Sequence, residues 1–444
     1  MIRYFYIPHS NFDDIVRDLE EIRLDFEPEF YFLFLTKSTL KICKGILKFL
    51  RKRYPCKMVG FTVEGFVTKD GVWTRGLAIL FFEKGVEVFW TKGENTERTF
   101  KRLKEKVGSG WDSAIVVFPL FRFGSRLSIL RFILANNTIW YHKYRRARCV
   151  EDRISILRDY SKVLESKYIF PPNKALRFFG EFPVVGFNLM PLQAGVKTPV
   201  MIVNYRMVGR SAVAVCFKGK INTRFHDVFP ERGRSFDETV EIIKSYFPSS
   251  VEVNVVKGGI AIGEINGVTP VKFLENSKYI RIYSEDETLR MIEREKFRTV
   301  SPYGLALISN ETFGSSLLGL GPVPLKIYPC LFDLDLFYDR ALFLGEHFKG
   351  GIRAFRGLFE GKSFEDSFDF FVIDSNVIPM FAGRCVEIKR MADDFCKDYF
   401  GILSAHPSFK FNLLNKNYLS EIQRGLCFTA SGTSAMLEIR DLEL

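Results

Sequence analysis

Apolar residues along the first 90 positions alternate between two spacings. A helical spacing comes first, and Ser10 or Asn11 is a suitable N-cap for it. Its apolar members are Phe12, Ile15, Val16, Leu19 and Ile22. The continuous apolar run 30–35 then indicates a buried strand, and residues 1–9 read as a first strand.

A helix over about 38–53 follows this run, because its apolar residues lie on one face and its lysines and arginines on the other. Strands are predicted at 58–63, 77–82 and 86–90, with turns at Asp70-Gly71 and Glu83-Lys84-Gly85. The order is therefore strand, helix, strand and then an antiparallel meander.

This order returns twice. The second copy has a strand at 114–118, helices at 125–134 and 151–165, a glycine-containing strand at 183–187 and an apolar strand within 209–219. The third has a strand at 370–373, a helix at 386–396, a glycine strand at 399–402 and a strand at 435–439. A strand–helix–strand crossover is parallel and right-handed. We predict an α/β (mixed α+β) fold of strand–helix–strand and antiparallel meander units in mixed sheets, in two domains.

The segment between the second and third copies supplies the predicted domain boundary. A helix at 235–247 begins with the capping box Ser235 and Glu238. Strands at 251–256 and 260–265 then form a hairpin, and a short helix lies at 270–274. We place a first domain at 1–247, a hairpin and boundary segment at 248–275, and a second domain at 276–444.

The hydrophobic runs and the composition argue against a membrane-spanning or secreted protein. No apolar stretch approaches the roughly 20 residues that span a bilayer, and the N-terminus lacks a secretory signal pattern. We therefore expect a cytoplasmic protein with no membrane span. Only Gln193 and Gln423 represent glutamine while 26% of residues are charged, which is typical of heat-adapted proteins.

Motifs for metal, cofactor or catalytic chemistry are weak. The eight cysteines are scattered without a CxxC pair, so neither a disulfide framework nor a zinc site is expected. There is no P-loop and no Gly-x-Ser-x-Gly elbow, and the chain has five histidines. We assign no catalytic residue, metal or cofactor.

The net charge of +12 raises the question of nucleic acid. Much of this charge lies in the helix 37–53, as a solvated face, and in the stretch 142–148, which resembles a loop before a helix. Because no nucleic-acid-binding motif accompanies it, nucleic acid is a possible but not favoured partner.

Asp333 and Asp335 alternate in the segment 332–336. Paired carboxylates on one strand face can hold a divalent metal for nucleotidyl transfer, with His347 and Asp374 as further ligands. The favoured interpretation is an edge strand with a polar face, since no nucleotide-binding motif is present.

The chain resembles the FIST family of sensory proteins, named for F-box and intracellular signal transduction. The glycine-centred segment 59–65 after Tyr54-Pro55 resembles the family's first glycine strand, and 183–187 with 203–206 and 211–215 resembles its second. The passage 253–270 and the C-terminal segment from Ile373 to Gly401 resemble later family patterns. Two positions depart from the family: Phe61-Thr62 replaces a Cys-Ser pair, and Leu403–His406 replaces a Gly-Glu.

The resemblance implies a FIST N-like and a FIST C-like domain that bind a small molecule such as an amino acid. With no output region in the chain, any signal would pass to a protein partner that the sequence does not identify. An enzyme acting on a small carbonyl or phosphate metabolite, and a nucleic-acid-associated basic protein, remain as alternatives.

The glycine strands supply the candidate ligand-binding residues. Gly60, Gly186 and Gly401 would let a ligand approach the backbone, or would relieve crowding where strands cross helices. Polar groups close to them would bind the ligand, with Arg384 holding a carboxylate. These polar candidates are Thr62, Glu64, Asn188, Arg384 and Ser404.

Overall fold

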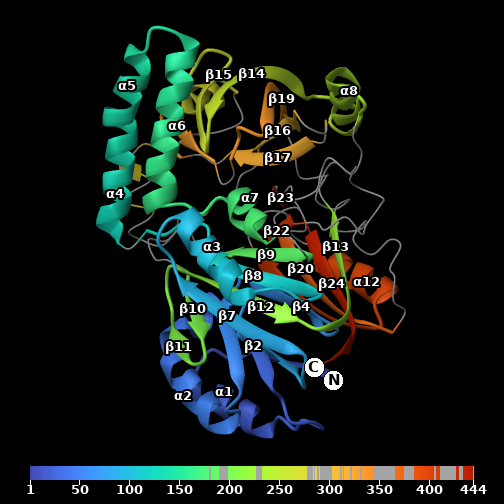
Figure 1. The fold of residues 1–444 in the computed structure, drawn as a ribbon. Coiled ribbons are helices and arrows are strands. Elements are labelled where there is room, and N and C mark those ends of the chain that lie inside the picture. The colour runs from blue at the N-terminus through green and yellow to red at the C-terminus, as the bar shows by residue number, and fades with distance from the viewer. Residues whose placement is uncertain are drawn as a thin grey trace.

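A computed structural model of the 444-residue chain shows a lower part of three β-sheets and an upper part of one sheet flanked by helices (Figure 1). The structure describes residues 1–123, 125–179, 182–189, 199–226, 233–277, 303–310, 315–320, 323–330, 333–344, 366–374, 385–404, 407–410, 427–429 and 434–443, and single positions 284, 286, 287, 290 and 313. We call the lower part the three-sheet body and the upper sheet the fourth sheet.

The first sheet is built from the N-terminal copy of the repeated order. Its own strands are β1 (Ile2–Ile7), β2 (Phe30–Leu35), β3 (Lys57–Thr62) and β6 (Leu77–Phe82). Helix α1 (Phe12–Glu21) begins at Asn11, whose side chain accepts a 2.9 Å hydrogen bond from the Asp14 amide. The predicted basic helix begins as a 3₁₀ segment, η1 (Lys37–Ile42), and continues as α2 (Cys43–Arg53).

The second and third sheets repeat the arrangement. The second is built around β7 (Val86–Lys92), β8 (Ser113–Pro119), β9 (Val184–Leu189) and β12 (Ser211–Phe217), with α3 (Thr96–Val107). The third is built around β13 (Gly219–His226), β20 (Phe368–Asp374), β21 (Asp398–Ser404) and β24 (Ser434–Leu442), with α12 (Cys385–Phe395). In each sheet the first strand of the crossover pairs in parallel with the glycine strand: Gly60 lies opposite Leu33, Gly186 opposite Val116 and Gly401 opposite Phe371.

The hairpin after each glycine strand crosses to a neighbouring sheet. The hairpin of β4 (Gly65–Thr68) and β5 (Gly71–Trp73) pairs with β21 of the third sheet. The hairpin of β10 (Met201–Val203) and β11 (Arg206–Met207) pairs with β3 of the first, and that of β22 (Pro407–Lys410) and β23 (Cys427–Thr429) pairs with β9 of the second. Over the described residues, each of these three sheets has six strands, and two of the six come from the hairpin of another copy in a cyclic exchange. The predicted fold class is confirmed.

One apolar core joins the three sheets. The Phe370 ring lies 5.9 Å from that of Phe32, 5.8 Å from that of Phe34 and 5.7 Å from that of Phe187, centroid to centroid. Phe61 bridges the first and second sheets by its contact with Phe187. The frequent phenylalanines of the strand runs therefore hold the body together by aromatic packing between sheets.

The fourth sheet is inserted between β13 and β20. It contains β14 (Val251–Gly258), β15 (Ala261–Ile265), β16 (Tyr303–Ser309), β17 (Ser315–Leu320), β18 (Tyr328–Pro329) and β19 (Phe337–Leu344), with α8 (Phe236–Tyr246) and α9 (Pro270–Asn276). Ser235 caps α8 through a hydrogen bond from the Glu238 amide, as predicted.

Helices from the second copy pack against this inserted sheet. They are α4 (Arg126–Leu134), the π-helical segment η2 (Ala135–Trp140), α5 (Tyr141–Arg146) and α6 (Val150–Lys167). Figure 1 shows α4, α5 and α6 beside β14 and β15. The prediction of a loop at 142–148 is wrong for its first part: α5 continues the helix to Arg146, because Asn136 and Asn137 bind the facing loop instead of ending the helix.

Strands of both predicted domains share sheets, since β4 pairs with β21 and β9 with β22. The segment 248–275 contains β14, β15 and most of α9. The division at 1–247, 248–275 and 276–444 stays a prediction from the sequence.

Candidate functional site

Thr62 lies at the carboxyl end of the parallel pair β2–β3. Phe61 and Val63 belong to the central core, so strand alternation turns Gly60 and Thr62 towards the face covered by α1 and α2. Thr62 is 3% exposed, and its hydroxyl has no hydrogen-bond partner within the described part of the chain. A buried hydroxyl without a partner is uncommon and calls for an explanation.

Polar backbone and side-chain groups surround this strand end. The Thr62 amide donates a 3.2 Å hydrogen bond to the Val200 carbonyl. Leu35 is the register partner of Thr62, and the next residue, Thr36, is the N-cap of η1. The Thr36 hydroxyl donates a 2.7 Å bond to the Gly76 carbonyl. The carboxyl ends of parallel strands, where a helix begins, are a common place for ligands.

The crossing hairpin brings two further predicted residues together. The Glu64 amide donates a 2.9 Å hydrogen bond to the carbonyl of Leu403, the residue before Ser404. Ser404 is 4% exposed at the end of β21, and alternation with Ile402 turns it towards the central core.

Asn188 occupies the matching place in the second sheet, fully buried in β9 two residues after Gly186. The structure therefore distributes the predicted residues over three sheets, with Glu64 and Ser404 adjacent. Arg384 lies outside the described residues. The ligand-binding roles of all eight positions stay predictions.

Neighbouring side chains occupy the space beside two of the glycines. A β-carbon at Gly60 would lie 3.2 Å from Ile202 Cδ1 and 3.3 Å from Leu33 Cβ. One at Gly401 would overlap the ring of Phe371. These contacts come from strands of the same sheet and not from a helix that crosses it, and the roles expected for the glycines stay predictions.

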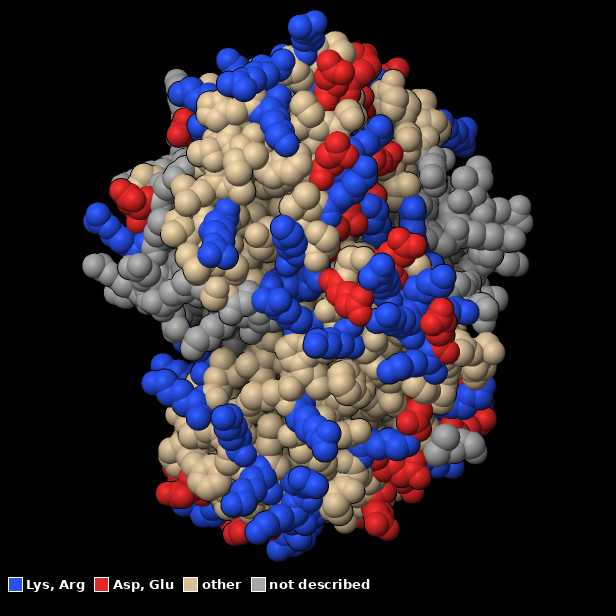
Figure 2. Space-filling view, turned by 60° about the vertical axis from the view of Figure 1, so that its left-hand side comes forward, with Lys and Arg blue, Asp and Glu red and all other residues tan. Residues whose placement is uncertain are grey.

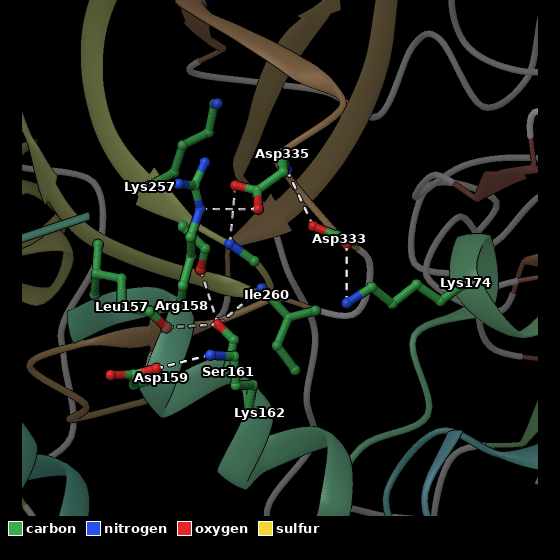
Figure 3. Close-up of polar contacts among 12 residues, drawn as sticks. Leu157, Arg158, Asp159, Ser161, Lys162, Lys174, Lys257, Ile260, Asp333 and Asp335 are labelled. Carbon is green, nitrogen blue, oxygen red and sulfur yellow. Dashed lines mark hydrogen bonds and ion pairs between the residues drawn. The ribbon is translucent and has the colours of Figure 1, made fainter. Parts of the chain in front are cut away.

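A charged cluster that the sequence did not predict joins the body to the fourth sheet (Figure 3). Lys174 lies in the short helix α7 (Pro172–Ala175), and its Nζ is 2.7 Å from Glu165 Oε1. The same Nζ is 3.0 Å from Asp333 Oδ2 (Figure 3). Asn173 exchanges two hydrogen bonds with the Asp333 backbone, of 2.8 and 2.9 Å. These contacts fix α7 to the segment before β19.

Asp335 extends the cluster to α6. It accepts a 3.1 Å hydrogen bond from Arg158 Nε and another of 3.1 Å from the Gly259 amide (Figure 3). The edge strand predicted at 332–336 is wrong over its described part: residues 333–336 form a turn before β19, because both carboxylates bind groups of other elements. No group of three or more potential metal ligands occurs among the residues that the structure describes.

Burial and charge shift two pKa values in this cluster. Burial raises the pKa of the Glu165 carboxyl, although Lys174 opposes this, and Asp333 and Asp335 raise it further. Burial alone would lower the pKa of Lys174, but Glu165 and Asp333 outweigh it, so that pKa is raised. The sequence gives little sign of this cluster, because Glu165 and Lys174 resemble the solvent-exposed charged residues of any surface helix.

We expect Glu165→Gln to change how stability depends on pH. A carboxyl with a raised folded-state pKa contributes most stability below its unfolded pKa and loses it as pH rises through the folded value. The variant lacks this loss, so its free energy of unfolding should rise relative to wild type as the pH increases above the unfolded pKa of about 4.3. Urea denaturation at pH values below and above this pKa measures the difference. Asp159→Asn in the exposed Lys162 pair is the control, and a Glu165→Gln difference that is flat with pH would contradict the assignment.

Comparison with known proteins identifies the family. A protein of Archaeoglobus fulgidus, described as uncharacterized, is 33% identical over 379 residues, which cover 85% of this chain and 99% of that protein. A family model for the AF0772-like protein C-terminal domain matches residues 237–349. The chain belongs to the AF0772-like family. The matched residues comprise almost all of α8 and the whole fourth sheet, so the C-terminal domain of the AF0772-like family corresponds here to the insertion before β20.

No helix in the described residues of this AF0772-like protein is long and apolar enough to cross a membrane.

Proposed function

We propose that this protein is a FIST-type sensory module that binds a small molecule and passes its state to a protein partner. The observation that carries the proposal is the buried Thr62 hydroxyl, without a hydrogen-bond partner in the described residues, at the carboxyl end of β2–β3. A ligand with a hydrogen-bonding group would satisfy this hydroxyl. The arrangement of strand, helix, glycine strand and hairpin in the three copies supports the FIST-type layout.

The crossing hairpins connect the end of β3, where such a ligand would bind, to the other sheets. The backbone of β3 bonds to Val200 next to β10, and Glu64 before β4 bonds to β21. A ligand at the end of β3 would therefore contact segments that continue into all three sheets. Small changes at this point would alter the packing between sheets, because close-packed interiors transmit strain.

We expect Thr62→Val to weaken ligand binding about tenfold while leaving the fold intact, because valine has the same shape but cannot make the hydrogen bond. Calorimetric titration with the compound that raises the melting temperature most, chosen from amino acids, small organic acids and nucleotides, measures the change.

Thr96→Val is the matched control. Its hydroxyl is also buried without a hydrogen-bond partner in the described part of the chain, but it lies at the start of α3. Equal affinities for wild type and both variants would rule out Thr62 as a ligand contact.

A further inference from the structure

A long stretch of this chain carries positive charge and no negative charge. From Ser113 to Val150 there is no aspartate or glutamate. The same stretch contains seven cations: Arg122, Arg126, Arg131, Lys143, Arg145, Arg146 and Arg148. Of these, Arg131, Lys143, Arg145, Arg146 and Arg148 are exposed, and none has an ion-pair partner among the described residues.

The same helices expose large aliphatic side chains. Leu127 is 53% exposed, Leu134 47% and Ile139 56%. Leu127 and Leu134 are seven residues apart and so lie on one side of α4, with Arg131 between them. We call this stripe, with the cations Lys143, Arg145 and Arg146 at its end, the α4–α5 face. Figure 2 brings this side of the molecule forward and shows a tan area bordered by blue in its upper left.

The opposite side of the helix explains why this face points outwards. Asn136 donates to the Ile327 carbonyl at 2.7 Å and to the Tyr160 hydroxyl at 2.8 Å. Asn137 donates to the Pro324 carbonyl and accepts from the Lys326 amide. Two consecutive residues can share the inner side because η2 is π-helical and therefore wider. These hydrogen bonds hold the inner side of the helix against the fourth sheet and α6, so the outer stripe faces the solvent.

We propose that the α4–α5 face is a docking surface for an acidic amphipathic helix of a partner protein. Leu127, Leu134 and Ile139 form a short exposed apolar stripe that the apolar side of a second helix can cover, and the flanking cations match acidic side chains. A symmetric dimer through this face does not fit, because the cations of the two copies would face each other. A bilayer fits less well, since Arg131 interrupts a narrow stripe that is one residue wide.

The acidic helix would belong to the protein partner that receives the signal, so this proposal rests on the function proposed above. Its test uses no small-molecule ligand, so a failure here leaves the Thr62 proposal standing, and the reverse also holds.

The test is fluorescence anisotropy with a labelled 21-residue synthetic helix that has leucines at heptad spacing and glutamates elsewhere. A lysine version of the same peptide is the negative probe. We expect wild type to bind the glutamate peptide with a Kd of roughly 10 µM or tighter. Leu134→Ser with Ile139→Ser, and separately Arg145→Glu with Arg146→Glu, should each weaken binding about tenfold or more. The half-exposed positions of these side chains favour an unchanged melting transition, which is to be measured for each variant.

Helix α2 provides the matched control. Lys48 and Arg51 are exposed and have no ion-pair partner among the described residues, but α2 exposes no large aliphatic side chain. Lys48→Glu with Arg51→Glu should change peptide affinity less than about twofold. Equal weakening by this control would show general charge attraction and overturn the proposal. So would no peptide binding at all, or binding to vesicles of 30% anionic lipid that is lost in the face variants.

Discussion

Replacing Phe370 with alanine should lower the free energy of unfolding by about 4 kcal/mol, the range found for large aromatic truncations in a core. Its ring is fully buried and contacts Phe32 and Phe34 of the first sheet and Phe187 of the second. It also stacks on Phe400 of its own sheet at 6.1 Å. Losing it would leave a cavity where the three sheets meet, and neighbouring sheets cannot readily collapse into it.

Urea denaturation followed by circular dichroism measures the loss for Phe370→Ala. Phe395→Ala is the control, because that ring is 42% exposed on α12 and its removal should cost less than about 1 kcal/mol. If the two variants lose similar amounts, the shared core is not what holds the three sheets together.

The second large effect is expected for Gly401→Ala. The new β-carbon would overlap the Phe371 ring, coming within 2.5 Å of its Cζ, and that ring is fully buried against α12 and its sheet neighbours. The ring cannot move aside without displacing other core residues. We expect a loss of about 3 kcal/mol, at the upper end for overpacked cores.

Gly209→Ala serves as the comparison, since no atom of the described residues lies within 4 Å of the β-carbon that it would gain. Its melting temperature should stay within about 2 °C of wild type. A stable Gly401→Ala variant would indicate free space beside β21, and would return Gly401 to the role of a glycine that admits a ligand.

The sequence predicted the repeated order because the glycine strands and their neighbours are short, apolar and flanked by clear turn and cap residues. Phe30–Leu35 is a fully buried strand, and Asn11 and Ser235 cap the helices predicted after them. The parallel pairing of each glycine strand with the strand before it followed from the crossover rule.

The exchange of hairpins between sheets was not predictable from one sequence. Local patterns specify that Gly65–Trp73 forms two strands, but not that β4 pairs with β21 more than 300 residues away in the chain. The helix at 141–146 was missed because Asn136 and Asn137 resemble a loop signal. Their partners, Pro324 to Ile327, are distant in sequence, and tertiary contact decided the conformation.

For the candidate site too, the sequence predicted local positions but not contacts between distant segments. The sequence placed Thr62 and Ser404 close to the glycines of the predicted strands, yet only the fold shows that Glu64 lies beside Ser404. The cluster of Lys174, Glu165 and Asp333 forms where α6 and α7 of the second copy meet the inserted fourth sheet, and no sequence pattern marks this meeting point.

The most direct test of a small-molecule sensor is a thermal-shift screen of the purified full chain against amino acids, small organic acids and nucleotides, with denaturant added if the transition is too high. Ligand at a hundredfold excess over its Kd stabilises the native state by about 2.7 kcal/mol. We predict a saturable rise in melting temperature with one chemical class, reduced in Thr62→Val and retained in Thr96→Val. Unchanged melting with every compound, in a protein shown to be folded, would contradict the sensory function.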